Sequence, residues 1–478
     1  MTNITNNKSE NLPCCGALDA AVKIASEVRA LGGETYFVGG CVRDRIMGIE
    51  SKDVDIEVHK IAPAILEKIL DGVGEKIEVG ASFGVYKLRG VDIDISMPRE
   101  DFARGLNGRE NERSRGHKDF DVIVNPFVGE RTAASRRDFT VNAMMENVIT
   151  GEILDFFGGR DDIKHKILRH VSDGTFADDP LRVLRGAQFA ARLGFEIAEE
   201  TRALSRSVDL SSLSRERVMG ELEKAMLTAE KPSVFFRELA EMAQLSPWFC
   251  EVESLIGVVQ GKKHHAEGDV FTHTMMVVDE AARRRGRANY ALGYMLSALT
   301  HDFGKALTTT IDADGSIHAY GHDDAGVPVA DKFIRRLTDE KRLVSYVKSM
   351  TKLHMKPLRY AAANSSVKAT NALFDESADP DDLLLLSEAD VSGSVPSGGD
   401  DERGRYGEFL SSRLEIYREY MARPYVKGQD LIDAGILPGE AFGEAMKYAH
   451  RLRLAGVDRE SALKQTIAFA RSAKKDDV

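Results

Sequence analysis

The hydrophobic periodicity of this chain changes near Phe156, and that change limits the folds open to it. Up to that point, short β-type runs separated by glycines accompany helical stretches at 18–31 and 63–70. Beyond it, amphipathic segments with helical spacing follow one another through short connections. At 478 residues the chain exceeds what one hydrophobic core usually organises. The sequence therefore predicts a multidomain α+β protein with a small mixed-sheet head, an all-α neck or body, a further helical domain and a helical tail.

Charge and cysteine content narrow the class of protein. Acidic residues outnumber basic ones by 76 to 65, a net charge of −11, which argues against a general polyanion binder and favours local basic patches. The four cysteines, Cys14, Cys15, Cys41 and Cys250, match neither a disulfide framework nor a zinc motif. No stretch approaches the about 18 consecutive apolar residues of a membrane span. We expect a soluble, cytoplasmic protein.

Two β-type runs carry carboxylates suited to metal binding. Asp53 and Asp55 stand two apart, so on a strand their side chains point to one face, and Asp94 in VDIDIS could complete the cluster from a neighbouring strand. Hard oxygen ligands of this kind suit Mg²⁺. Two such ions would activate a ribose hydroxyl and stabilise a leaving pyrophosphate. A lone DxD more often marks a solvated strand face, so its context decides.

That context is a glycine pair upstream. Gly39 and Gly40 follow the run TYFV and precede a predicted helix, so their backbone N–H groups could approach a triphosphate closely. Arg43 could pair with the phosphate oxygens. A simple tight turn would explain the glycines alone. The glycine pair and the paired carboxylates, about a dozen residues apart, together indicate a nucleotide-binding metal site much more specifically than either feature alone.

Several motifs in a fixed order carry a family resemblance. GGCVRD followed by KDVDIEV resembles the head of class II tRNA nucleotidyltransferases and bacterial poly(A) polymerases. RRDFTVNAM at 136–144, ADDPLRVLRGAQFAARLGF at 177–195 and SRERVMGELEKAM at 214–226 resemble the successive motifs of that family. The resemblance covers nearly the whole chain. It implies a polymerase-β-like head that adds or repairs the 3′-terminal CCA of tRNA without a template, using CTP, ATP and Mg²⁺.

The resemblance also implies how the base is selected. An acceptor on Asp179 beside a donor on Arg182 matches the edges of cytosine and adenine, and Arg185 would face the triphosphate. Arg182, Arg185 and Gln188 recur three apart on one helical face. A capped helix with salt-bridging arginines is the alternative. The family commonly has Glu at Asp178 and Arg at Gln188, and the second departure removes a charge near the nucleotide.

Two further elements of the head take their roles from the same resemblance. Arg137 sits where the family places a nucleotide contact, and Asp138 where it places a helix-positioning carboxylate, although a structural salt bridge would also explain Asp138. The charged segment from Arg99 to Lys118 reads as a long mobile loop. It occupies the position of the family's flexible loop, which is tied to the switch from adding C to adding A. A solvated loop without a role is the alternative.

Histidines and aspartates in the C-terminal half form a second candidate centre. Their order resembles that of an HD-superfamily phosphohydrolase, and THDFGK ends an apolar helix, a costly place for a His-Asp pair that binds nothing. Such ligands suit Mn²⁺, Fe²⁺, Co²⁺ or Ni²⁺. The resemblance implies hydrolysis of 2′,3′-cyclic phosphates or phosphomonoesters, with Lys305 near a phosphate. One metal would bind His273, His301, Asp302 and Asp390, and a possible second His322 and His354. His264 and His265 are expected to be a surface pair.

These patterns divide the chain into five expected parts. They are a flexible N-terminus at 1–17, a nucleotidyltransferase head at 18–158, a helical neck and body at 159–258, an HD domain at 259–395 and a helical tail at 396–478. The Gly- and Ser-rich stretch from Ser392 to Gly404 is predicted to be a loop. RNA would lie along the body and tail, where Arg283 to Arg287 offer phosphate contacts.

The motifs leave rival functions open. A poly(A) polymerase, or an enzyme adding only CC or only A, would share the head motifs. A phosphohydrolase whose head only binds RNA would not need the intact Asp53 and Asp55 pair, and an RNA-binding adaptor would leave both metal clusters unexplained. We expect tRNA, CTP and ATP as partners and neither DNA nor a membrane. The sequence leaves the oligomeric state open.

Overall fold

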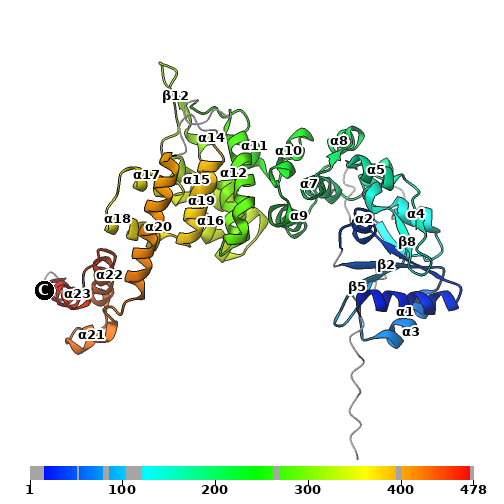
Figure 1. Cartoon of the computed structure of the whole chain (residues 1–478), viewed down its shortest axis with the longest axis horizontal. Coiled ribbons are helices and arrows are strands. Elements are labelled where there is room, and N and C mark those ends of the chain that lie inside the picture. The colour runs from blue at the N-terminus through cyan, green and yellow to red at the C-terminus, as the bar shows by residue number, and fades with distance from the viewer. Residues whose placement is uncertain are drawn as a thin grey trace, which may run out of the picture. The chain divides into compact units, whose positions relative to one another are not determined.

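The computed structural model describes residues 16–50, 53–78, 85–103, 120–261, 268–394 and 401–473. The chain forms two compact units, Met1–Leu213 and Ser214–Val478 (Figure 1). The predicted flexible N-terminus, with Cys14 and Cys15, lies outside the described residues up to position 15, as does the pair His264 and His265. Across the described residues, no helix is both long and apolar enough to cross a lipid bilayer.

The first unit is built on a seven-stranded mixed sheet in the order β3-β4-β5-β2-β1-β8-β9. Only β2 and β5 pair in parallel, and the other neighbours are antiparallel. Helices α1 (Ala17–Ala30) and α3 (Pro63–Val73) bury their apolar residues against one face of this sheet. The strands are β1 (Glu34–Val38), β2 (Val54–His59), β3 (Lys76–Glu78), β4 (Val85–Leu88), β5 (Val91–Ser96), β8 (Met145–Asn147) and β9 (Ile153–Leu154).

Alternation along two central strands separates the core from the functional face. Val54, Ile56 and Val58 of β2, like Ile93 and Ile95 of β5, belong to the core under α1 and α3. Successive side chains on a strand point to opposite faces, so the acidic residues between them lie on the other face. The predicted α+β head with a mixed sheet is confirmed.

Helices and short strands complete the first unit after the sheet. Helix α7, which carries the predicted nucleotide-selecting residues, ends at Gly194 in a left-handed conformation (φ 66°) that glycine adopts without strain. The elements are α2 (Gly40–Ile46), α4 (Glu130–Ser135), η2 (Thr140–Asn142), α5 (Gly159–His165), β10 (Ile167–Leu168), α6 (Asp173–Phe176), α7 (Leu181–Leu193), β11 (Glu196–Ile197) and α8 (Glu199–Ser205).

Two predicted loops begin or end differently in the structure. The segment Arg99–Ala103 is strand β6, paired antiparallel with β7 (Phe120–Val124), so the predicted loop from Arg99 to Lys118 starts five residues too early. Strand β6 forms despite its charged residues because strand pairing is made by backbone hydrogen bonds, which do not require apolar side chains on both strands. Residues 104–118 lie outside the described part of the chain.

The predicted loop from Ser392 to Gly404 is also too long. Helix α19 (Pro380–Ser392) extends to its first residue, and α20 (Asp401–Ala422) already includes its last four. Isolated glycines are tolerated inside a helix at a cost of about 1 kcal/mol each, so the glycines that suggested a loop do not end α20.

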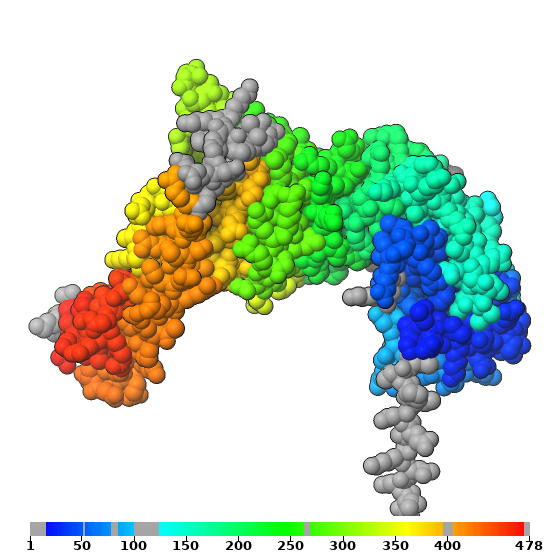
Figure 2. Space-filling model, viewed as in Figure 1, coloured from blue at the N-terminus to red at the C-terminus, as the bar shows by residue number. Residues whose placement is uncertain are grey.

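The second unit is helical, as the periodicity predicts. Helices α12, α13, α15, α16 and α19 pack against one another as a bundle, and a short hairpin of β12 and β13 projects from its surface (Figures 1 and 2). The elements before α19 are α9 (Arg215–Thr228), α10 (Ser233–Glu241), α11 (Cys250–Glu253), α12 (Val270–Arg284), η3 (Arg285–Arg287), α13 (Ala291–Thr300), α14 (Lys305–Thr308), β12 (Thr310–Ile311), β13 (Ile317–His318), α15 (His322–Leu337), α16 (Lys341–Leu353), α17 (Lys356–Ala362) and α18 (Val367–Glu376).

The C-terminal end of this unit has a small core of its own. Leu431, Ile436, Ala445 and Ala470 are buried together there. They join α21 (Gly428–Asp433), α22 (Glu440–Leu454) and α23 (Arg459–Ala473).

Candidate active sites

Strand pairing brings the predicted carboxylates together on the functional face of the sheet. Asp55 of β2 and Asp94 of β5 are register partners in the parallel ladder, and Asp53 immediately precedes β2. Lys87 of β4 is the partner of Asp94 on the other side, with its Nζ 2.7 Å from Asp94 Oδ1. Burial, and next the Asp94 carboxylate, raise the pKa of Asp55 above its usual range.

This carboxylate cluster has the donor set of a divalent-metal site. Three hard oxygen donors fit Mg²⁺, and burial, followed by the nearby Asp94 carboxylate, raises the pKa of Asp55. Lys87 supplies one compensating charge to Asp94. Asp53, Asp55 and Asp94 are therefore the residues that would hold magnesium.

The glycine turn lies directly against these carboxylates. Gly39 has φ 75°, and a Cβ added there would lie 3.5 Å from Asp55 Oδ2 and 3.6 Å from Arg137 Nη1. The positive φ requires glycine, and the turn brings backbone close to both side chains. Helix α2 starts at Gly40, so the predicted sequence of strand, glycine turn and helix is confirmed.

Arg43 is buried and linked to the head's interior. Its guanidinium donates to Asp44 Oδ1 from Nη2 at 2.6 Å and to Asn142 Oδ1 from Nη1 at 2.7 Å. These bonds tie α2 to η2. A direct contact between Arg43 and a triphosphate stays a prediction.

Arg137 is held in place by an acidic residue that the sequence analysis missed. Its Nη2 donates to Glu57 Oε2 at 3.1 Å, and Glu57 Oε1 lies 2.9 Å from Nε2 of the buried His59. Burial alone would raise the pKa of Glu57, but Arg137 and His59 lower it. Glu57 continues the two-residue spacing of Asp53 and Asp55, and that alternation was the signal for it. Arg137 and Glu57 line a pocket of about 250 Å³ that also includes Ser96, Arg99 and Arg136.

Asp138 anchors α7 to the head. The Nε and Nη2 atoms of Arg185 each lie 2.8 Å from Asp138 Oδ2, while Asn142 Nδ2 and the Phe139 backbone N–H donate to Oδ1. Burial would raise the pKa of Asp138, but Arg185 and these hydrogen bonds lower it. Asp138 thus forms both a buried salt bridge and a support for the helix, the two roles left open by the sequence.

Asp138→Ala should reduce the free energy of unfolding by about 3 kcal/mol, because it leaves a largely buried arginine without its carboxylate. The shift of the urea midpoint of the full-length protein measures this loss. Glu196→Ala is the matched control, since its exposed ion pair with Arg202 should contribute less than about 1 kcal/mol. Equal shifts for the two variants would contradict the anchoring role.

The predicted base-selecting residues lie at the start of α7. Asp179 Oδ1 accepts a hydrogen bond from the Leu181 backbone N–H at 3.1 Å. Arg182 donates from Nη1 to Thr175 O and from Nη2 to Arg136 O, both at 2.6 Å. Gln188, about two turns further along α7, is only 1% exposed, so the polar face that begins at Arg182 is buried at its C-terminal end.

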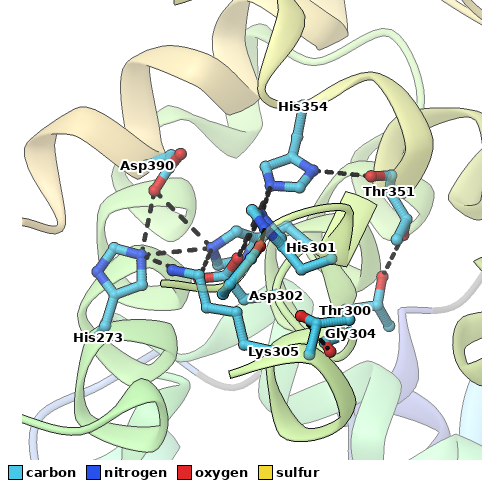
Figure 3. A network of polar contacts seen from close by, with 12 residues as sticks. His273, Thr300, His301, Asp302, Gly304, Lys305, Thr351, His354 and Asp390 are labelled. Atoms are coloured by element: carbon cyan, nitrogen blue, oxygen red, sulfur yellow. Dashed lines mark hydrogen bonds and ion pairs between the residues drawn. The ribbon is translucent and has the colours of Figure 1, made fainter. Parts of the chain in front are cut away.

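The second centre gathers six side chains from five segments of the helical bundle, and Figure 3 labels all of them except His322. Asp302 Oδ2 lies 3.2 Å from His301 Nε2 and 3.6 Å from His273 Nε2, and its Oδ1 lies 3.3 Å from His322 Nε2 and 3.8 Å from His354 Nε2. Asp302 therefore faces one histidine pair with each oxygen. Asp390 Oδ1, from α19, lies 3.1 Å from His273 Nε2.

Backbone contacts orient three of the four imidazoles toward Asp302. The Nδ1 atoms of His301, His322 and His354 lie 2.7–2.8 Å from backbone carbonyl oxygens three residues earlier. A carbonyl only accepts, so each Nδ1 carries a proton and each Nε2 faces the centre. This is the arrangement of imidazoles that bind metals.

The electrostatics of the centre also favour a cation. Burial would raise the pKa of Asp302, but the Lys305 ammonium and His301 hold it well below its usual range. Burial, followed by His301, lowers the pKa of His354 to about 4, so its ring is neutral at neutral pH. The triads His273, His301, Asp302 and Asp302, His322, His354 each have ligand atoms close enough for one ion. The geometry thus brings together all six predicted residues.

Known proteins resemble this chain over most of its length. Residues 35–169 match the model of the poly A polymerase head domain. The multifunctional CCA protein of Haemophilus influenzae is 37% identical over 327 residues, covering 66% of this chain and 73% of the relative. That of Halorhodospira halophila is 32% identical over 440 residues, covering 90% and 98%.

Solved structures share the fold. The Bacillus stearothermophilus CCA-adding enzyme in complex with CTP aligns with a TM-score of 0.62 at 20% identity, covering 96% of this chain and 99% of that one. The Thermotoga maritima CCA-adding enzyme complexed with tRNA aligns with a TM-score of 0.59 at 19% identity, covering 94% of each.

Proposed function

The chain belongs to the multifunctional CCA protein family, and from this premise we propose that it builds or repairs the CCA end of tRNA with CTP and ATP. The observation that carries the proposal is the pairing of Asp55 with Asp94 beside the Gly39 turn and Arg137. The tRNA 3′ oxygen forms a bond to the α-phosphorus of the nucleotide. The bond from that phosphorus to the bridging oxygen breaks, and pyrophosphate leaves.

Different residues of the head would bind the metal and the nucleotide. Bound magnesium would favour ionisation of the 3′ hydroxyl and neutralise charge on the phosphates. Asp53, Asp55 and Asp94 hold it, Gly40 offers its backbone to the triphosphate, and Arg137, fixed by Glu57, binds the nucleotide. Arg43 and Arg185 are further candidates for phosphate contact.

Asp179 and Arg182 are the proposed base-selecting pair. An acceptor beside donors matches cytosine and adenine, whereas guanine and uracil present the opposite pattern. Arg182 now donates to two backbone carbonyls, so contact with a base requires exchanging part of those bonds. Asp138 anchors this helix through Arg185, and Gln188 of the same helix is buried.

The helical bundle supports a second activity, a metal-dependent phosphohydrolase. A transition metal such as Mn²⁺, Ni²⁺, Co²⁺ or Fe²⁺ would bind at His273, His301, Asp302 and Asp390, with His322 and His354 available for another. Its charge would polarise a phosphate ester toward attack by water. Lys305, 2.7 Å from Asp302, is placed to contact that phosphate. We propose 2′,3′-cyclic phosphates and phosphomonoesters as substrates, and the cytoplasm as the place of action because tRNA is matured there.

Extension of a tRNA transcript that ends before CCA tests the head. With Mg²⁺, CTP and ATP, the protein should add three nucleotides and stop, resolved at single-nucleotide length. CTP alone should give CC. A long A tail, or only CC or only A from the full mixture, would identify a sibling activity and contradict full CCA addition.

A further inference from the structure

The metal centre opens into a large pocket whose outer rim has a chemistry of its own. The pocket, about 740 Å³, is lined at its base by Asp302, His322 and Asp390. Its rim includes His318 and Tyr320, which the proposed hydrolysis does not use. This volume far exceeds the need of a phosphate group and leaves room for a larger group attached to it.

His318 and Tyr320 form a flat aromatic surface at this rim. Their rings stack with centroids 4.9 Å apart and an interplanar angle of 11°. His318 also contacts Asp312, whose Oδ2 lies 3.3 Å from His318 Nε2. Tyr320 is 78% exposed, which is unusual for a large aromatic ring. One face of the Tyr320 ring is thus covered by His318, and most of the ring is open to solvent.

The aromatic surface lies next to the metal centre in the sequence. Only Gly321, with φ 70°, separates Tyr320 from His322. Ala319, which lies between His318 and Tyr320, accepts a hydrogen bond from Nδ1 of His322 at 2.8 Å. The segment that orients a metal-facing imidazole therefore also sets the position of the Tyr320 ring.

The rest of the pocket is suited to an anion. Lys305 Nζ lies 2.7 Å from Asp302 Oδ2 and 2.8 Å from Gln260 Oε1. Arg359 of α17 is exposed at the pocket wall and, among the described residues, forms no ion pair. A ligand with a phosphate near the metal centre and a planar ring at the rim would interact with both ends of the pocket.

We propose that Tyr320, backed by His318, stacks the base of a nucleoside phosphate whose phosphate lies at Asp302 and Lys305. Base-on-aromatic stacking tolerates every base, because each has a π-face, so the surface selects nucleosides over other phosphate esters without reading sequence. The inference rests on the proposed phosphohydrolase function. The nucleoside phosphate is a free mononucleotide or the 3′ end of an RNA, which offer the same chemistry.

Hydrolysis by the full-length, Mn²⁺-loaded protein tests the proposal with two cyclic phosphates. For 2′,3′-cyclic AMP, Tyr320→Ala should raise KM about tenfold, the loss typical of one stacked base, with kcat nearly unchanged. For glycerol 1,2-cyclic phosphate, which has no base, the same variant should match the wild type. Tyr320→Phe should keep the wild-type KM. Ile311→Ala is the matched control, an exposed side chain on the neighbouring strand β12 that does not line the pocket.

Each outcome decides between the two ideas. If the wild type hydrolyses both compounds with equal kcat/KM, or Tyr320→Ala changes them equally, the stacking proposal is wrong and the phosphohydrolase stands. If the wild type hydrolyses neither compound, the proposed phosphohydrolase function is wrong. The stacking proposal is then tested by calorimetric binding of adenosine 2′-monophosphate to the wild type and to Tyr320→Ala. Any binding to the head is the same in both proteins, so a difference in affinity reports on Tyr320. Equal affinity would overturn the stacking proposal. An oligonucleotide ending in a cyclic phosphate then shows by its kcat/KM whether an RNA end or a mononucleotide is preferred.

Discussion

Asp55→Asn should reduce CCA addition by about 10³-fold or more while leaving the fold intact. The substitution keeps the side chain's size but removes one of the charges proposed to hold magnesium, and metal stabilisation of phosphoryl transfer amounts to several kcal/mol. The raised pKa of Asp55 shows that the wild-type carboxylate is destabilised by burial and by Asp94. Removing its charge should therefore preserve or increase thermal stability. Single-turnover extension of a tRNA lacking its terminal A measures the rate, and thermal unfolding measures the stability.

The matched control is Asp71→Asn on α3. Its carboxylate is exposed and lies in a helix that packs on the opposite face of the sheet. This variant should extend tRNA at the wild-type rate. Hydrolysis of 2′,3′-cyclic AMP should be unchanged in both variants. An Asp55→Asn protein that still extends tRNA within tenfold of the wild type would remove the carboxylate cluster from the mechanism.

Asp302→Asn should have the opposite pattern, with metal binding and phosphohydrolase activity lost and CCA addition kept. Asp302 contributes to both ligand triads, so one substitution weakens two sets of ligands at once. Loss of a charged ligand should lower affinity for Mn²⁺ at least about 100-fold, more than the effect typical of an outer-shell change. Titration calorimetry with Mn²⁺ gives the affinity, and cyclic phosphate hydrolysis gives the activity.

Asp331→Asn serves as the control for this second centre. Asp331 lies on α15, the helix that His322 begins, but pairs with Arg335 and Lys348 away from the pocket. It should bind Mn²⁺ like the wild type. Retention of wild-type Mn²⁺ affinity by Asp302→Asn would mean that the His-Asp cluster is a polar network and not a metal site.

Most strands and helices of the head can be predicted from hydrophobic periodicity, but the arrangement of its site residues can be predicted only in part. The strands around Val54 and Val91 and the helix after Gly39 were predictable from alternation and turn residues. The parallel pairing that sets Asp55 beside Asp94 was not, because strand order depends on contacts between distant segments. The two-residue alternation placed Glu57 on the same face, but its role depends on Arg137, 80 positions away, and this contact could not be predicted.

Burial was the least predictable property of the candidate residues. Arg43 and Gln188 occupy positions where the sequence suggests contact with a nucleotide, yet both side chains are buried in the structure. Helical spacing fixes which residues share a face but not which neighbour covers that face. At 99–103 the charged composition suggested a loop, and only pairing with a distant apolar strand reveals the hairpin.

The order of histidines and aspartates predicted the second centre as a set. The sequence placed all six residues on helical segments but could not show that Asp302 directs one oxygen to each histidine pair. That division depends on how α13, α15 and α16 pack, a property of the bundle as a whole.

A single carboxylate serving two ligand sets has a thermodynamic consequence. If both sets bind the proposed metal, an ion in one set would withdraw negative charge from Asp302 and fix its orientation, and so would change the affinity of the other set. By linkage the effect is reciprocal: each ion alters the binding of the other by the same factor. Binding at the two positions would then be coupled. A metal titration should follow a curve whose Hill coefficient differs from one.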